Sequence, residues 1–320
     1  MKILLASPRG FCAGVKRAVR ALDEALAAGS GPIWALHEIV HNASVVERFR
    51  RRGVRFVDSL EEIPDRAVVL FSAHGVAPKV REKALARGLT VIDAACPLVE
   101  RVHRLARRFA EEGYHILYIG HRGHQEVIGT LGEAPGSITL VASADDVPNV
   151  SPPADRPLTV LMQTTLSFAE AERIASALRE RFPNLTIPSD AGICFATRHR
   201  QEAVKTLLPE SDAVVVVGSA NSSNSRRLAE LPVAAGKRSL LIDSAADLRQ
   251  SDFSAGDTVL LTAGASAPED LVEECLGWFR ARFGAEVQER TVFDERTAFR
   301  PVVIPPGAIT PGAITPGKIQ

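Results

Sequence analysis

Three of the four cysteines could act together as metal ligands. Cys12, Cys96 and Cys194 each stand directly before a stretch in which apolar residues recur at helical spacing. They are too far apart for a local zinc or ferredoxin motif, so only the fold could bring them together. Three thiolates without a fourth would leave an open coordination position, which is typical of a catalytic metal centre. We expect the helix dipole to lower the pKa of each thiol and to favour the anion.

The alternative for any one cysteine is a small, packed hydrophobic side chain. Cys275 fits that description, because it lies in the middle of a helical stretch beside Leu276 and Phe279, and we predict that it is a core residue. For the other three cysteines, residue types and spacing leave two possibilities open. They form an iron–sulfur site, or they are scattered structural cysteines.

Polar side chains gather where the predicted strands end. Five of the eight histidines fall in these few turns. In parallel sheets, ligands bind beyond the carboxyl ends of the strands, and histidine, hydroxyl and amide donors near helix N-termini suit a phosphate group. Any single Ser, Thr or Asn there could equally be an ordinary N-cap. The set consists of His37, His41, His74, His121, His124, Glu126, Thr164, Thr165, Asn221, Ser222, Ser223, Asn224 and Ser266.

Glu126 is the only carboxylate within this polar set. A carboxylic acid placed among hydroxyl and imidazole groups is suited to donate or accept a proton during a reaction. We therefore predict that Glu126 is the proton donor of the site.

The elements that would carry these residues alternate along the chain. Short apolar, β-branched runs are separated by amphipathic helical stretches, which indicates an α/β fold with mainly parallel sheets covered on both faces. The predicted strands are 67–71, 90–92, 116–119, 158–161, 213–217, 239–242 and 258–261.

The strand, cysteine and helix pattern occurs three times, which predicts three similar α/β domains in a pseudo-threefold arrangement. We expect 1–13 to be an N-terminal strand with the first cysteine, packed on the third domain. The domains are expected at 14–96, 97–193 and 194–290, with a C-terminal extension at 291–320. Within it, 305–317 holds two copies of Pro-Gly-Ala-Ile-Thr, and we expect this tail to be disordered or loosely attached.

The charges of the 320-residue chain balance, with 38 basic and 38 acidic residues. This balance gives no reason to expect nucleic acid or an anionic membrane as a partner. No apolar run approaches the roughly 20 residues of a membrane span, and the first apolar run is too short for a secretory signal. We expect a soluble, cytoplasmic protein whose cysteines are not paired in disulfides.

Nine segments, in order along the chain, resemble the family of 4-hydroxy-3-methylbut-2-enyl diphosphate reductases, the last enzymes of the non-mevalonate isoprenoid pathway. Their order and number make the resemblance specific, and it extends from about residue 1 to about residue 285. The segments are Pro8–Val15, His37–Asn42, Phe71–Val76, Asp93–Val99, Gly120–Glu126, Gln163–Ser167, Ile193–Thr197, Asn221–Ser225 and Thr262–Pro268.

The resemblance implies a trefoil of three α/β domains around one [4Fe-4S] cluster per chain. Cys12, Cys96 and Cys194 would be its ligands, and the fourth iron would bind the substrate hydroxyl. Glu126, His124 and Thr164 would be the catalytic residues, with His124 and Thr164 lining the hydroxyl end. The residues implied to hold the diphosphate are His41, His74, Ser222, Ser223, Asn224 and Ser266.

The reaction implied by the resemblance removes the substrate hydroxyl as water, with two electrons and two protons. It yields isopentenyl and dimethylallyl diphosphates, and ferredoxin or flavodoxin supplies the electrons. Two features depart from the family pattern: Ala95 stands where a threonine is common, and the repeated tail is unlike the family. Two other functions stay open: a non-catalytic iron–sulfur electron carrier or sensor, and a zinc-dependent phosphate-ester hydrolase.

Overall fold

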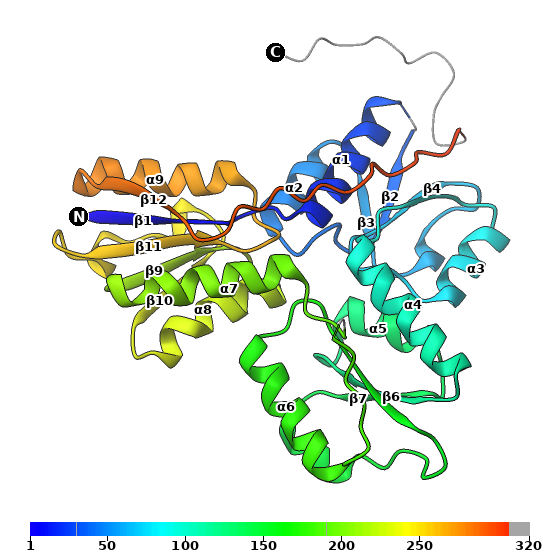
Figure 1. The fold of residues 1–320 in the computed structure, drawn as a ribbon. Coiled ribbons are helices and arrows are strands. Elements are labelled where there is room, and N and C mark those ends of the chain that lie inside the picture. Colours follow the sequence, from blue (N-terminus) through cyan, green and yellow to red (C-terminus); the bar gives the residue numbers. More distant parts are fainter. Residues whose placement is uncertain (30, 190, 307–320) are drawn as a thin grey trace.

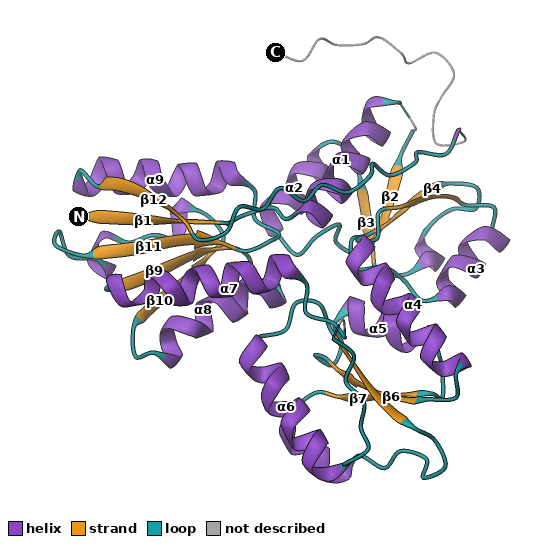
Figure 2. Cartoon of the chain, in the orientation of Figure 1, coloured by secondary structure: helices purple, strands orange, loops and turns teal. Residues whose placement is uncertain are grey.

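The computed structural model describes residues 1–29, 31–189 and 191–306, which form three α/β units around a common centre (Figure 1). Each unit contains one sheet, and the three sheets have five, four and three strands. Within the described residues, every strand pairing is parallel. The predicted fold class, a trefoil of α/β units with mainly parallel sheets, is confirmed. Helices cover the sheets, and loops from all three units meet at the centre (Figure 2).

The first unit contains a four-stranded sheet in the order β3-β2-β4-β5. All four residues of the inner strand β4 are buried, because helices and loops cover both faces of the sheet. Its strands are β2 (Ile33–Leu36), β3 (Arg55–Val57), β4 (Val68–Phe71) and β5 (Thr90–Asp93), and its helices are α1 (Ala13–Ala27), α2 (Ala43–Arg51), α3 (Pro78–Ala86) and the short η1 (Leu60–Glu62).

The second unit contains a three-stranded sheet in the order β7-β6-β8. Its central strand is also fully buried, and the first helix starts with a proline, which is favourable in a first turn. The strands are β6 (His115–Ile119), β7 (Ile138–Val141) and β8 (Leu158–Met162), and the helices are α4 (Pro97–Glu111), α5 (Gln125–Leu131), α6 (Phe168–Arg181) and the short η2 (Ala144–Asn149).

The third unit contains a five-stranded sheet in the order β10-β9-β11-β1-β12. The N-terminal strand β1 lies between β11 and β12, so both ends of the sequence contribute to one sheet. The strands are β1 (Lys2–Ser7), β9 (Ala213–Val217), β10 (Arg238–Ile242), β11 (Thr258–Ala263) and β12 (Glu286–Thr291), and the helices are α7 (Phe195–Leu207), α8 (Ser223–Ala234), α9 (Glu269–Phe283) and the short η3 (Leu208–Glu210), η4 (Ala245–Asp247) and η5 (Gln250–Asp252).

Two details differ from what the sequence suggests. Strands β2, β3, β7 and β12 are additional to those predicted, and β12 is a polar edge strand without a continuous apolar run. Cys194 follows an irregular segment rather than a strand, with a single parallel bridge between Thr159 and Thr186 upstream of it. The third repeat of the strand, cysteine and helix pattern is therefore incomplete. The exact domain bounds stay a prediction.

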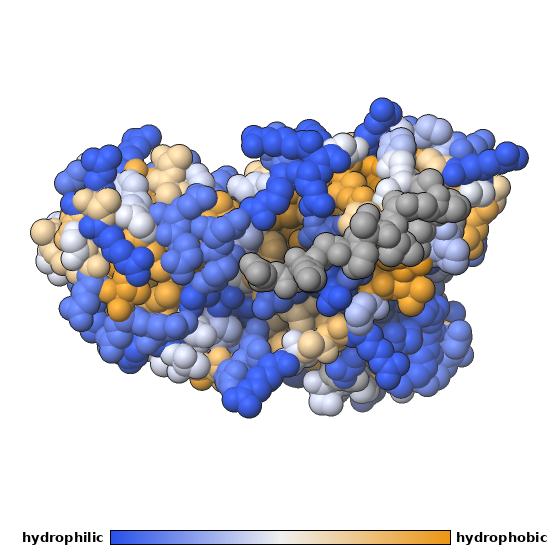
Figure 3. Space-filling model, turned by 90° about the horizontal axis from the view of Figure 1, so that it is seen from above, coloured by the Kyte–Doolittle hydropathy of each residue, from blue (hydrophilic) through white to orange (hydrophobic). Residues whose placement is uncertain are grey.

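Cys275 is fully buried in the apolar core of the third unit, as predicted for a packing residue. Across the described residues, the longest helices are too short and too polar to cross a membrane. Figure 3 shows one face of the molecule, on which hydrophilic residues predominate and apolar residues lie between them. Most of the repeated Pro-Gly-Ala-Ile-Thr tail lies outside the described residues.

Candidate functional site

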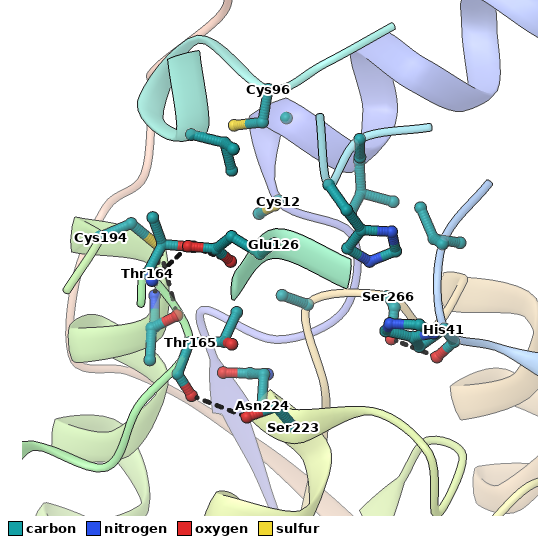
Figure 4. Close-up of a pocket in the computed structure, with 18 of the residues that line it drawn as sticks. Cys12, His41, Cys96, Glu126, Thr164, Thr165, Cys194, Ser223, Asn224 and Ser266 are labelled. Carbon is teal, nitrogen blue, oxygen red and sulfur yellow. Dashed lines mark hydrogen bonds between the residues drawn. The ribbon is translucent and has the colours of Figure 1, made fainter. Parts of the chain in front are cut away.

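Cys12, Cys96 and Cys194 are the N-cap residues of α1, α4 and α7. Because the three helices begin at the centre of the trefoil, the three thiols line the same cavity (Figure 4). The cavity has a volume of about 90 Å³. The cysteine residues are only partly exposed. The fold therefore brings together three thiols that are distant in the sequence.

Gly14 lets the first turn of α1 approach the second cysteine closely. A Cβ atom at this position would lie 2.5 Å from Cys96 Sγ and 3.9 Å from Cys12 Sγ. Real Cβ atoms do not approach a sulfur that closely, so any larger residue would displace the Cys96 side chain. The backbone of Gly14 thus forms part of the wall around two of the thiols.

The thiol pKa values contradict the expectation from the helix dipole. Burial raises the pKa of Cys96 to about 12 and that of Cys194 to about 11, and charge on Cys12 acts in the same direction. Backbone N–H groups at the starts of α4 and α7 lower both values, but by less than burial raises them. The desolvation of these thiols depends on the packing of the whole fold, whereas the dipole of each helix acts only near its own end. These thiols are protonated at neutral pH until a cation replaces their protons.

The donor set suits a metal cluster better than an ordinary packed core. Three soft sulfur ligands face one cavity, and Thr197 donates its backbone N–H to Cys194 Sγ at 3.3 Å. Sulfurs that accept such hydrogen bonds are typical of iron–sulfur sites. Among the described residues, no three His, Cys, Asp or Glu side chains are placed to hold a single metal ion.

Glu126 is buried at one side of the cavity and is fixed by Thr164. The backbone N–H of Thr164 donates to Glu126 Oε1 at 2.6 Å, and its hydroxyl donates to Oε2 at 2.9 Å (Figure 4). Burial raises the pKa of the Glu126 carboxyl, and the two hydrogen bonds from Thr164 lower it by less. The net rise in pKa makes this carboxyl, which faces the cavity, better suited to exchange a proton than an ordinary exposed glutamate.

Three imidazoles form another part of the wall. The rings of His41 and His74 are stacked with centroids 4.2 Å apart, and His124 meets them edge-on at 5.3 and 5.7 Å. Burial lowers the pKa of His124 to about 3 and that of His74 well below its ordinary value, and the neighbouring histidines add to both shifts. Without a ligand, His74 and His124 are neutral at pH 7. An anion in the cavity would favour their protonated, positive forms.

Hydroxyl and amide groups at the start of α8 complete the wall opposite the thiols (Figure 4). Ser222 is the N-cap of α8, and Ser223 and Asn224 occupy its first turn. Asn224 is 3% exposed, yet its amide nitrogen and oxygen have no hydrogen-bond partner among the described residues. Ser266 donates to the carbonyl of His41 at 2.8 Å. Unpaired polar atoms at a helix N-terminus suit an anionic ligand.

All twelve residues that the sequence analysis assigns to the site line this one cavity. His37, His121 and Asn221 from the wider polar set do not line it. Gly14 and Thr197 also line the cavity, although they are not among the assigned site residues. A Cys-x-x-Thr spacing before a helix could have indicated Thr197, because the third helical residue commonly donates its N–H to the N-cap. The close approach of Gly14 to Cys96 has no local sequence signal.

Comparisons with known proteins agree with one another. The family model described as "LytB protein" matches residues 3–280. The 4-hydroxy-3-methylbut-2-enyl diphosphate reductase of Rhodopirellula baltica is 50% identical over 299 residues, which cover 93% of this chain and 94% of that protein. The enzyme of the same name from Burkholderia pseudomallei is 45% identical over 300 residues, covering 94% of this chain and 96% of that protein.

Solved structures show the same fold. The E-1-hydroxy-2-methyl-but-2-enyl-4-diphosphate reductase from Plasmodium falciparum matches with a TM-score of 0.89 and 32% identity, covering 93% of this chain and 95% of that one. A structure of (E)-4-hydroxy-3-methyl-but-2-enyl diphosphate reductase, described as the terminal enzyme of the non-mevalonate pathway, matches with a TM-score of 0.64 and 31% identity. It covers 88% of this chain and 100% of that one.

Proposed function

Because this chain belongs to the LytB protein family and is an oxidoreductase of isoprenoid biosynthesis, we propose that it converts 4-hydroxy-3-methylbut-2-enyl diphosphate to isopentenyl and dimethylallyl diphosphates. This reaction would be the last step of the non-mevalonate pathway. The observation that carries the proposal is the cavity itself. Three thiols, one buried carboxyl and a set of anion-binding groups line a single small space.

Cys12, Cys96 and Cys194 would hold one [4Fe-4S] cluster per chain. When bound, the cluster supplies electrons and an open iron site with Lewis-acid character for the substrate hydroxyl. The backbone of Gly14 leaves space beside Cys12 and Cys96, and the backbone N–H of Thr197 donates to the Cys194 sulfur. Because the thiols of Cys96 and Cys194 have raised pKa values, loading the site must release protons.

The diphosphate would lie against the wall opposite the thiols. Ser223 and Asn224 stand in the first turn of α8, where backbone N–H groups and the helix dipole favour an anion. The unpaired amide of Asn224 can donate to phosphate oxygens. His41 and His74 would face the diphosphate, whose negative charge would favour the protonated form of His74. The residues proposed for this role are His41, His74, Ser222, Ser223, Asn224 and Ser266.

Glu126, Thr164 and His124 would act at the hydroxyl end. The overall change consumes two electrons and two protons, breaks the C–O bond, forms a C–H bond and releases water. Glu126 holds a proton on a buried carboxyl and donates it to the departing hydroxyl oxygen. Thr164 orients the carboxyl through both of its oxygens. His124 lines the same cavity, and its Nδ1 accepts the backbone N–H of Glu126 at 3.2 Å.

Apolar side chains also line the cavity. Val15, Val40 and Val99 line it and offer no hydrogen bonds to water. A five-carbon allylic chain would fit this section, and excluding water there would prevent side reactions.

The electron donor would be ferredoxin or flavodoxin. The cytoplasmic location of the protein stays a prediction from the sequence.

Anaerobic assay of the purified protein tests the proposal directly. We expect a brown protein with a Mössbauer spectrum of a four-iron centre that has one distinct iron. With a strong one-electron donor, it should reduce the hydroxylated C5 diphosphate to the two products. Colourless protein with stoichiometric zinc would instead support a hydrolase. An iron centre without turnover of this substrate would support an electron carrier or sensor.

Replacing single cysteines tests the ligand assignment. Cys194→Ser should lose most of its iron, because a hydroxyl is a poor ligand for iron in this setting. Cys275→Ser is the matched control, since Cys275 is buried in the core and does not line the cavity. Iron content per chain is the measurement. Equal iron retention in the two variants would refute the assignment of Cys194.

A further inference from the structure

Arg200 is a buried cation that connects two of the cysteine turns. It lies on α7, the helix that Cys194 caps, and only 1% of the residue is exposed. Its Nε and Nη2 donate to the carbonyl of Gly10 at 3.2 and 2.8 Å, two residues before Cys12. Its Nη1 donates to the carbonyl of Ala196 at 2.9 Å. The planar guanidinium therefore fixes the distance between the Cys12 turn and the Cys194 turn.

Arg17 makes the corresponding connection between the Cys12 turn and the Cys96 turn. It lies in α1, the helix that Cys12 caps, and its Nη1 donates at 2.8 Å to the carbonyl of Ala95, the residue directly before Cys96. The guanidinium is partly buried and lies close to Cys96. One arginine from each of two cysteine-capped helices thus reaches a neighbouring cysteine turn.

A single stretch of chain accepts hydrogen bonds from both arginines. We call residues 293–300 the C-terminal segment; it follows β12 and runs across the front of α1 (Figure 1). Glu295 accepts two bonds from Arg200 Nη1, both at 3.1 Å, and the carbonyl of Arg300 accepts from Arg17 Nε at 2.9 Å. The ring of Phe293 stacks on His199 with centroids 4.4 Å apart. Packing and hydrogen bonds together fix the segment to both helices.

We propose that Arg17 and Arg200 are positioning residues for the three cysteine turns and that the C-terminal segment holds both guanidinium groups in place. The proposal rests on the proposed function, because it assumes that the turns bind a cluster. Arg200 sets the Cys194 turn against the Cys12 turn, and Arg17 sets the Cys12 turn against the Cys96 turn. Two such connections are enough to fix three ligands relative to one another.

Arg17 also places positive charge beside a ligand turn, whereas the charge of Arg200 is paired with Glu295. Burying a guanidinium costs desolvation energy that its hydrogen bonds must offset, so a fully buried arginine indicates a requirement for its geometry or charge. A nearby cation stabilises the more negative, reduced form of a redox centre. Loss of the Arg17 charge should therefore lower the reduction potential, whereas loss of its hydrogen-bond geometry should loosen the turns.

Variants of Arg17 separate these two effects. In anaerobically reconstituted protein, Arg17→Gln should transfer iron to a chelator at least about tenfold faster than the unmodified chain and should have a lower midpoint potential. Arg17→Lys keeps the charge but cannot make both hydrogen bonds. It should release iron quickly while restoring most of the potential. Arg20→Gln is the matched control, because Arg20 is an exposed residue of α1 that pairs with Glu24. It should match the unmodified chain in both measurements.

Glu295→Gln tests the Arg200 connection, because replacing a fully buried guanidinium risks unfolding the protein. We expect this variant also to release iron several-fold faster, with a melting temperature of the apo-protein close to that of the unmodified chain. The proposal is overturned if Arg17→Gln and Glu295→Gln both release iron at the rate of Arg20→Gln.

A measurement on the apo-protein keeps this inference separate from the proposed function. Alkylation of each thiol by iodoacetamide, followed by mass spectrometry, reports how well the cysteine turns are held without any metal. Arg17→Lys, which keeps the positive charge beside the thiol, should raise the labelling rate of Cys96 several-fold, while the rate for buried Cys275 stays constant. Failure of the unmodified chain to bind iron would refute the proposed function alone. Unchanged labelling of Cys96 would refute the positioning role alone.

Discussion

The Glu126 carboxyl shows how two opposing influences set the chemistry of one residue. Burial removes water and raises its pKa, while the hydrogen bonds from Thr164 favour the charged form. Burial has the larger effect. The hydrogen bonds from Thr164 nevertheless orient the carboxyl group, which is also able to carry a proton.

Glu126→Gln should therefore keep the cluster and lose most of the turnover. Glutamine has nearly the same shape and can still accept the N–H of Thr164, but it cannot deliver a proton. We expect kcat to fall by about 10²- to 10⁴-fold, the usual contribution of a general acid. Iron content and kcat should be measured together. Glu112→Gln, which changes an exposed residue, is the control. Near-normal turnover in Glu126→Gln would remove this residue from the mechanism.

The buried histidines make stability depend on pH. Histidine in an unfolded chain has a pKa of about 6.5, whereas burial lowers the pKa of folded His124 to about 3. Between these values the unfolded state binds more protons, so the free energy of unfolding falls as the pH drops below 6.5. His74 shifts in the same direction.

His124→Asn should remove part of this pH dependence. Asparagine can still cap α5 by accepting the N–H of Glu126, as His124 does. We expect the unmodified apo-protein to lose about 1 to 2 kcal/mol more stability than the variant between pH 7.5 and pH 5. Urea unfolding at the two pH values measures the difference. An identical loss in both proteins would show that His124 does not titrate in this way.

Among the elements, α1, α4 and α7 have equivalent places, because each begins at a cysteine and at the centre of the trefoil. Backbone N–H groups in the first turns of α4 and α7 reach the thiols of Cys96 and Cys194. The elements differ in how closely they approach one another. The start of α1 can contact Cys96 only because residue 14 has no side chain.

Gly14→Ala should disturb the site without weakening the helix itself. Alanine is favoured over glycine inside a helix by about 1 kcal/mol, but its Cβ would lie 2.5 Å from Cys96 Sγ. We expect the iron content to fall below about half of that of the unmodified chain. Gly277→Ala is the matched control, because Gly277 lies in α9 with open space around its Cβ position. That variant should keep its iron and gain slightly in stability. Full iron content in Gly14→Ala would show that the Cys96 side chain can move without loss.

For the molecule as a whole, the site is shared among three units that each have their own sheet. Polar contacts cross between the units near the cavity: Ser266 donates to the carbonyl of His41, and Asn221 donates to Glu38 at 2.8 Å. A ligand that contacts the first and third units at once would hold them together. Ligand binding should therefore stabilise the entire fold.

Inorganic diphosphate should raise the melting temperature of the apo-protein. At 100 times its dissociation constant, a ligand contributes about 2.7 kcal/mol to the free energy of unfolding. Asn224→Ala should weaken binding about five- to tenfold, because one hydrogen bond contributes about 1 to 1.5 kcal/mol. Ser151→Ala, in a surface loop, is the control. Equal thermal shifts in Asn224→Ala and the control would place the diphosphate elsewhere.

The sequence by itself determined the elements and the residue types at their ends. Apolar runs of β-branched residues predict strands such as β4, β6 and β9, because the alternation of buried strands and helices is a local property. The N-cap positions of Cys12, Cys96 and Cys194 follow from the same local spacing. Polar β12 was missed because an edge strand needs no apolar run.

Only the tertiary structure decided the distances and the electrostatics. The thiols of Cys96 and Cys194 were expected to be acidic, but burial by surrounding units raises their pKa values beyond what a helix dipole offsets. The links from Arg17 and Arg200 to neighbouring cysteine turns join positions far apart in the chain, and no local pattern predicts them. Periodicity acts over a few residues, whereas desolvation and contact between turns depend on how the three sheets pack.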